Sequence, residues 1–114
     1  MTIESFVKHY NLHDSYITSS EYSADSCHLR LLIDFAFWMQ ASYKEGEPEN
    51  GVIRVDFQDV DQYLCEEGDP AGAFVGILGS EYNDGLLIIK LLDDETNEYF
   101  EMQIKAGSVN VTIV

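Results

Sequence analysis

Apolar residues recur at every second position between residues 27 and 40. The seven odd positions of this segment are all apolar, whereas the even positions carry mixed side chains. This period of two predicts a long β-strand with one buried face, because successive side chains of a strand point to opposite faces. A helix would scatter the same residues around its circumference. The residues of the predicted buried face are Cys27, Leu29, Leu31, Ile33, Phe35, Phe37 and Met39.

Shorter segments of strand-like composition surround this long strand. The segment 86–92 is apolar at odd and even positions, which predicts a strand covered on both faces. The sequence NDG at 83–85 is typical of a hairpin, and Gly107–Ser108 predicts another two-residue turn. Gly76 and Gly79 indicate a bulge. The predicted shorter strands cover residues 14–23, 52–57, 74–82, 86–92, 99–105 and 109–113.

Two short helices are predicted beside the strands. Residues 3–10 place apolar side chains at the i, i+3, i+4, i+7 spacing of one helix face. Thr2 is the expected N-cap, and Asn11 is expected to end this helix in a left-handed conformation. Residues 60–64 fit one or two further helical turns, with Asp59 as their N-cap.

Together these elements predict a single domain over residues 1–114, with surface loops at 44–51 and 66–72. The expected fold class is mainly β, a β-rich α+β fold. It consists of about seven strands in a single antiparallel sheet or flattened barrel, with a short N-terminal helix. A chain of this length buries roughly two-thirds of its surface, enough for a core without disulfides or metal. An open sheet edge could pair with a second copy in a homodimer.

The charge of the chain then narrows the class of partner. The sequence has 21 acidic and 6 basic residues, which gives a net charge of −15. Such a field repels phosphate backbones and anionic membranes, so we expect neither nucleic-acid binding nor membrane binding. It attracts a basic protein and speeds the encounter with it. The alternative is that the acidic charge only keeps the protein soluble.

The two cysteines and the absence of targeting signals predict a cytoplasmic protein. Cys27 and Cys65 do not form a Cys-x-x-Cys pair, which excludes a zinc ribbon and a thioredoxin motif. No apolar run reaches the ~18 residues of a membrane span, and the N-terminus has no apolar signal core. We expect both thiols to be reduced and Cys27 to lie in the core.

His13, Asp14 and Ser15 stand side by side at the start of the strand predicted over 14–23. Neighbours in an extended chain point to opposite faces, so the three cannot form a catalytic relay with one another. We expect Asp14 instead to accept backbone N–H bonds two residues on, in an Asx-turn that starts the strand. A small metal-dependent hydrolase that uses His13, Asp14 and His28 is the alternative.

Other motifs of catalytic, metal-binding and phosphate-binding sites are incomplete in this sequence. Asp56, Asp59 and Asp61 lack the glycine and the late glutamate of a calcium loop. Gly79 and Ser80 lack the second glycine of a nucleophile elbow, and no Gly-rich phosphate loop is present. We therefore expect no metal and no cofactor, and we favour a protein that is not an enzyme.

Trp38 lies near the end of the long predicted strand, on the face opposite Phe35 and Phe37. We expect it to cover a second small core; as an alternative, it is an exposed anchor for a partner. A ligand-binding β-barrel with a cavity beneath Trp38 is a third hypothesis. The candidate binding residues of the chain are therefore His13, Asp14 and Trp38.

The sequence LHDSYI, followed by CHLRLLIDFAFW at residues 27–38, resembles a group of small bacterial proteins of unassigned function. These proteins combine a short helix with an L-H-D-S-x-I motif at the start of a strand. Some of them resemble immunity proteins of polymorphic toxin systems, which bind a toxin encoded beside them. The resemblance implies no catalytic residues. Together with the charge, it favours a non-enzymatic acidic protein that binds a basic protein partner. The residues that match the motif are Leu12, His13, Asp14, Ser15 and Ile17.

Overall fold

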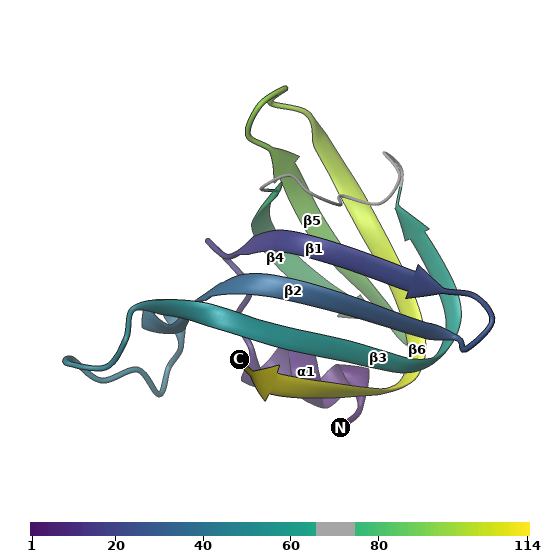
Figure 1. The fold of residues 1–114 in the computed structure, drawn as a ribbon, viewed down its shortest axis with the longest axis horizontal. Helices are drawn as coiled ribbons and strands as arrows, with labels where there is room; N and C mark the ends of the chain where they lie inside the picture. Colours follow the sequence, from purple (N-terminus) through teal and green to yellow (C-terminus); the bar gives the residue numbers. More distant parts are fainter. Residues whose placement is uncertain (66–74) are drawn as a thin grey trace.

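The computed structural model describes residues 1–65 and 75–114. Six antiparallel strands close into a barrel in the order β1-β2-β3-β6-β5-β4 (Figure 1). The mainly β fold with a short N-terminal helix is confirmed in its barrel form, and residues 1–65 and 75–114 contain six strands, close to the predicted number of about seven. The predicted loop at 66–72 lies outside the described residues. The elements are α1 (Ile3–His9), β1 (Tyr16–Ser23), β2 (His28–Ala36), the 3-10 turn η1 (Phe37–Met39), β3 (Asn50–Cys65), β4 (Val75–Asn83), β5 (Leu86–Asp93) and β6 (Tyr99–Ile113).

Strand β2 is the strand that the alternating pattern predicts. It pairs with β1 on one side and with β3 on the other. Both ends of the prediction need correction, however. Cys27 lies exposed in the turn before β2 with a φ of 50°, so it is not a core residue. After Ala36 the chain leaves the strand and forms η1. The buried odd-numbered residues of β2 are Leu29, Leu31, Ile33 and Phe35.

Strand β3 contains residues 60–64, so the helix predicted there is wrong. Asp59 takes a φ of 54°, and the pairing of β3 with β6 shifts between Val60 and Gln62. These two irregularities change which face of the strand is buried, as bulges do. Val60 is buried and Tyr63 is partly buried, and this spacing imitates the period of a helix.

Strand β6 runs through Gly107 and Ser108 without a turn. The pairs Gln58–Ser108 and Val60–Ala106 place Gly107 opposite Asp59. The β3–β6 ribbon bends sharply in this region (Figure 1). A Cβ atom on Gly107 would lie 3.0 Å from the Cβ atom of Asp59. The glycine therefore permits a close approach of two strands, and the two strands predicted over 99–113 are one.

The β4–β5 hairpin confirms two predictions from glycine. Asp84 and Gly85 connect the strands with φ values of 54° and 83°, as a tight hairpin turn requires. The pairing shifts between Ile77 and Gly79, which is the predicted bulge. Strand β5 is covered less completely than predicted. Its odd-numbered side chains Leu87, Ile89 and Leu91 are buried, whereas its even-numbered side chains are partly exposed.

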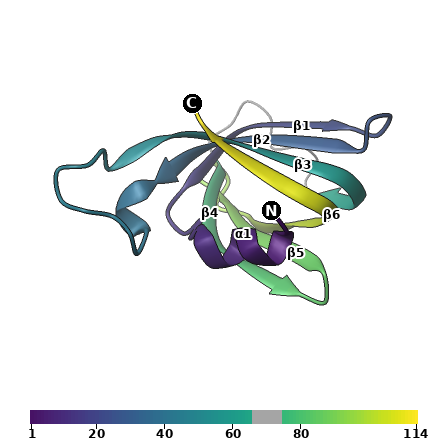
Figure 2. The same cartoon turned by 90° about the horizontal axis from the view of Figure 1, so that it is seen from below.

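Helix α1 lies against β4 and β6 (Figure 2). The Thr2 hydroxyl accepts a hydrogen bond from the Ser5 N–H at 3.1 Å, so the predicted N-cap is confirmed. The helix ends at Tyr10 in an extended conformation, and Asn11 does not take the predicted left-handed one. Phe6 of α1 packs edge-on against Phe57 of β3, with 6.0 Å between ring centroids. Full burial of one such side chain contributes about 2–3 kcal/mol to stability.

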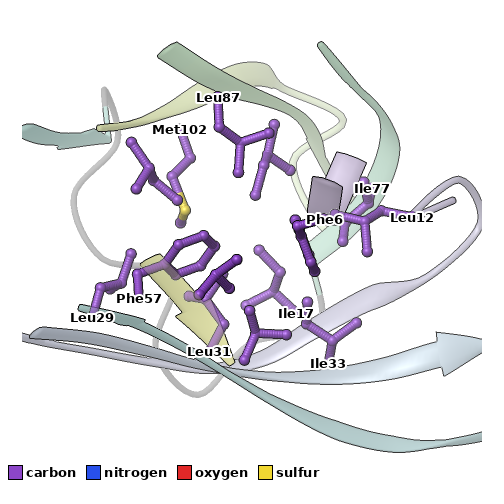
Figure 3. Close-up of a cluster of buried hydrophobic side chains, with 14 of the residues drawn as sticks. Phe6, Leu12, Ile17, Leu29, Leu31, Ile33, Phe57, Ile77, Leu87 and Met102 are labelled. Carbon is purple, nitrogen blue, oxygen red and sulfur yellow. The ribbon is translucent and has the colours of Figure 1, made fainter. Parts of the chain in front are cut away.

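Apolar side chains of the barrel and of α1 fill the barrel interior (Figure 3). Phe6, Leu12 and Ile17 enter this core from the N-terminal segment, and Met102 enters it from β6. Because the interior is occupied by these side chains, a functional surface has to be sought on the outside and at the ends of the barrel.

Two residue pairs between β1 and β4 close the barrel. They join Tyr16 to Gly76 and Ile17 to Val75. These strands would be the edges of an open sheet. A homodimer through a sheet edge therefore stays a prediction that concerns only the parts of β1 and β4 beyond the two pairs. The closure lies directly after the LHDS segment, which gives that segment a structural role.

Candidate functional site

The LHDS segment starts β1 and fixes it to the end of β2. Leu12 and Ser15 are buried, with exposures of 1% and 0%, whereas the side chains of His13 and Asp14 are about half exposed. The Ser15 hydroxyl oxygen accepts a hydrogen bond from the Ala36 N–H at 3.0 Å. A hydroxyl held in this way is a structural group, because solvent and substrate do not reach it.

The Asx-turn before β1 is formed by Asn11, and the prediction that Asp14 forms it is wrong. The side-chain oxygen of Asn11 accepts a hydrogen bond from the His13 N–H at 3.1 Å. Asp14 has a φ of 63°, and its backbone N–H donates to the Ile77 carbonyl at 3.1 Å. Its carboxylate lies 3.3 Å from Nδ1 of His13. Asp14 therefore turns the chain into β1 through its backbone.

His13, Asp14 and His28 do not converge on one site. Asp14 precedes β1, whereas His28 pairs with Ser23 at the far end of the β1–β2 hairpin. The rise from Tyr16 to Ser23 alone is about 23 Å. Over residues 1–65 and 75–114, no group of three His, Cys, Asp or Glu side chains is placed to hold a metal ion. The arrangement proposed for a metal-dependent hydrolase is therefore not formed.

His28 belongs to a different polar cluster, on the outer face of β2 and β3. The Asp56 carboxylate accepts hydrogen bonds from Nε of Arg30 at 2.8 Å and from Nε of Arg54 at 3.2 Å. His28 Nε2 lies 2.9 Å from the same carboxylate. Burial raises the pKa of the Asp56 carboxyl, but Arg30 and then His28 outweigh it and lower that pKa below its usual value. Asp56 in turn raises the pKa of Arg30.

Sequence reasoning missed this cluster, although part of its signal was present. The alternation in β2 puts His28 and Arg30 on the outer face, and the alternation in β3 puts Arg54 and Asp56 there. Only the register, which sets Arg30 beside Asp56, brings the two sets together. Register between distant strands follows from the folded sheet and is not written in either strand alone.

Ion pairs engage most of the few basic side chains of the protein. Of the 6 lysines and arginines, Lys44 and Lys105 alone form no ion pair within the described part of the chain. The acids greatly outnumber the bases, and apart from Asp56 none of those described is buried. The negative charge therefore faces solvent with little compensation. The pairs join Lys8 to Glu4, Arg30 and Arg54 to Asp56, and Lys90 to Glu81.

Trp38 lies in η1, and 44% of it is exposed. Its backbone N–H donates to the Glu49 carbonyl at 3.1 Å. The prediction that Trp38 covers a second core is therefore wrong. Because β2 ends at Ala36, the 3-10 turn removes Trp38 from the alternating pattern on which that prediction rested. Exposure leaves the alternative, an anchor for a partner, as its candidate role.

Gln40 holds η1 against the segment that precedes β1. Its side-chain oxygen accepts a hydrogen bond from the Asn11 N–H at 2.9 Å, and its side-chain nitrogen donates to the Asn11 carbonyl at 2.7 Å. The same nitrogen donates to the Ala36 carbonyl at 2.9 Å. The segments that carry Trp38, His13 and Asp14 are therefore joined at one end of the barrel.

Two hollows lie beside η1. The first, here named the loop groove, has a volume of about 300 Å³ and is lined chiefly by Phe37, Tyr43, Glu47, Pro48 and Ile113. The second has a volume of about 500 Å³ and is lined by residues that include His13 and Met39. Phe37, and not Trp38, lines the loop groove. The loop groove is a hollow on the outside of the barrel, and the ligand cavity beneath Trp38 stays a prediction.

Comparisons of the chain with family models, curated proteins and solved structures give no match. Within residues 1–65 and 75–114, no helix has the length and apolar character needed to cross a membrane. Function is therefore inferred from the charge and geometry of the chain itself.

Proposed function

We propose that this protein binds a basic protein partner and catalyses no reaction, in the manner of a toxin-neutralising immunity protein. The observation that carries the proposal is the uncompensated acidic surface. The chain has a net charge of −15, and ion pairs among the described residues engage four of its six bases. A basic protein approaching this surface is steered towards it, which raises the association rate.

Trp38 supplies an anchor within the acidic surface. Exposed tryptophans are frequent hot spots of protein interfaces, because they bury a large apolar area on binding. Three exposed acids, Glu45, Glu47 and Glu49, lie in the loop between η1 and β3. This combination of an aromatic centre and a charged rim is typical of an interface with a basic protein.

The product of the adjacent gene is the partner to test first, because immunity proteins are encoded beside their toxins. Isothermal titration of the two purified proteins at increasing salt measures the dissociation constant. We expect this constant to rise steeply with salt, and to rise at least tenfold for Trp38→Ala.

Tyr82→Ala is the matched control, since Tyr82 is a similarly exposed aromatic residue near the β4–β5 turn. It should change the dissociation constant by less than about twofold. The proposal fails if neither the neighbouring gene product nor any basic protein of the source cells binds. It also fails if binding is unaffected by salt and by Trp38→Ala.

A further inference from the structure

We infer that the loop groove binds an arginine side chain of the basic partner. The guanidinium group lies against the rings of Phe37 and Tyr43 and pairs with the carboxylate of Glu47. This inference rests on the function proposed above and deepens it, because it assigns one pocket to one type of partner side chain.

The carboxylate of Glu47 is held in position by the turn that carries it. One carboxylate oxygen accepts a hydrogen bond from the Lys44 N–H at 2.7 Å, and the Glu47 N–H donates to the Lys44 carbonyl at 3.1 Å. The Tyr43 hydroxyl donates to the Glu47 carbonyl at 3.1 Å. No ion pair engages Glu47 within the described residues. Its second carboxylate oxygen, Oε2, therefore remains available to a cation.

The aromatic wall of the groove is also fixed. The ring of Phe37 packs edge-on against Phe35, with 5.3 Å between ring centroids. It also lies directly over Gly51, where a Cβ atom would come within 2.6 Å of the ring. Gly51 thus leaves the space that the ring occupies. A wall that is ordered before binding lowers the entropic cost of recognising a side chain.

Two further residues of the lining form an apolar wall. Ile113 is 71% exposed although it is a large aliphatic residue, and Pro48 lines the same groove. A volume of about 300 Å³ is at the lower limit of ligand pockets, so it suits one long side chain better than a larger ligand. The methylene groups of an arginine would pack on this apolar wall, as the stems of long charged side chains do.

Charge and shape favour arginine as the occupant. Glu45 and Glu49 flank Glu47 in the sequence and are exposed, so the surroundings repel an anion. A neutral apolar group would remove water from the Glu47 carboxylate without replacing its hydrogen bonds. Guanidinium is planar, stacks on aromatic rings and can bond a carboxylate through two N–H groups. Lysine offers a point charge without the flat face.

The test uses two short peptides, acetyl-Gly-Arg-Gly-amide and its citrulline analogue, which has nearly the same shape but no charge. Each is titrated into the ¹⁵N-labelled full chain and followed by amide chemical shifts. We expect the arginine peptide to shift residues 37–48 and Ile113, and to bind at least threefold more tightly than the citrulline peptide. Glu47→Gln should abolish this preference. Glu95→Gln removes the same charge from the exposed β5–β6 turn and should preserve it.

Three results would overturn the inference. These are equal binding of the two peptides, shifts that lie away from the loop groove, and equal weakening by Glu47→Gln and Glu95→Gln. The last result would mean that only the overall field attracts arginine. The peptide titration needs no partner, so it tests the groove even if no basic protein is found. Conversely, a basic partner whose affinity Glu47→Gln leaves unchanged would refute the groove and preserve the proposed function.

Discussion

Replacing Ser15 by alanine tests whether the LHDS segment is structural or catalytic. The side chain of Ser15 is fully buried, and its hydroxyl oxygen accepts a hydrogen bond from the Ala36 N–H at 3.0 Å. Alanine would leave that N–H buried without an acceptor, which costs about 1–3 kcal/mol. Only one oxygen atom is removed, so the cavity term is small. We expect the free energy of unfolding to fall by about 2 kcal/mol and the Tm by about 8 °C.

Urea unfolding followed by circular dichroism measures this change. The midpoint should fall while the slope of the transition stays the same, because the surface exposed on unfolding is unchanged. Ser19→Ala is the matched control: Ser19 lies half-buried in β1, and no hydrogen bond joins its side chain to the described residues. It should alter stability by less than about 0.5 kcal/mol. Unchanged stability of Ser15→Ala with loss of a measured activity would refute the structural reading.

Charge pairing and left-handed or crowded backbone positions give three more predictions. Asp56→Asn should lower the free energy of unfolding by about 2 kcal/mol at neutral pH. Because folding lowers the pKa of Asp56, this difference in stability should persist above about pH 5 and shrink as the pH falls below about 4. A difference that stays constant at acidic pH in urea titrations would contradict the ion-pair account. Asp14→Gly, at a φ of 63°, should raise the free energy of unfolding by up to about 1 kcal/mol, and a lower Tm would show instead that the carboxylate stabilises the fold. Gly107→Ala should lower the free energy of unfolding by about 1 kcal/mol, because the added Cβ atom contacts Asp59. Gly79→Ala is the control: its Cβ atom meets no atom within 4 Å, so it should raise the free energy of unfolding by about 0.5 kcal/mol. Equal effects of the two substitutions in chemical denaturation would exclude the close approach as the cause.

The sequence predicts those parts of the fold in which the period of two is uninterrupted. From Leu29 to Phe35 every second side chain is buried, and β2 appears as expected. In β3 the left-handed conformation of Asp59 and the later bulge change which face of the strand is buried. The buried residues of this strand are therefore spaced as in a helix. The sequence predicts a turn at Gly107. In the structure this glycine lies in β6 opposite Asp59 of β3, and it leaves room for the irregular backbone at Asp59. Both errors arise because a bulge depends on two paired strands at once.

The candidate site is predictable by residue type and not by arrangement. Trp38 and His13 can be singled out because exposed aromatic and imidazole groups are common in functional sites. The two segments that carry them are joined by the hydrogen bonds between Gln40 and Asn11, which are 29 residues apart. Glu47 and the other residues of the loop groove carry no motif at all, because a loop acquires its shape from the strands at its two ends.

The size and placement of the charge bear on the choice between the proposed partner binding and mere solubility. A net charge of −15 destabilises a compact chain through self-repulsion, and a smaller charge would already keep it in solution. The two arginines, which could offset the acids at the surface, are both directed at the buried Asp56. The loop beside Trp38 carries three exposed acids and a single lysine, Lys44, which forms no ion pair within the described residues. Uncompensated acids next to an exposed aromatic residue suit an interface with a basic protein, which is the role proposed for this surface.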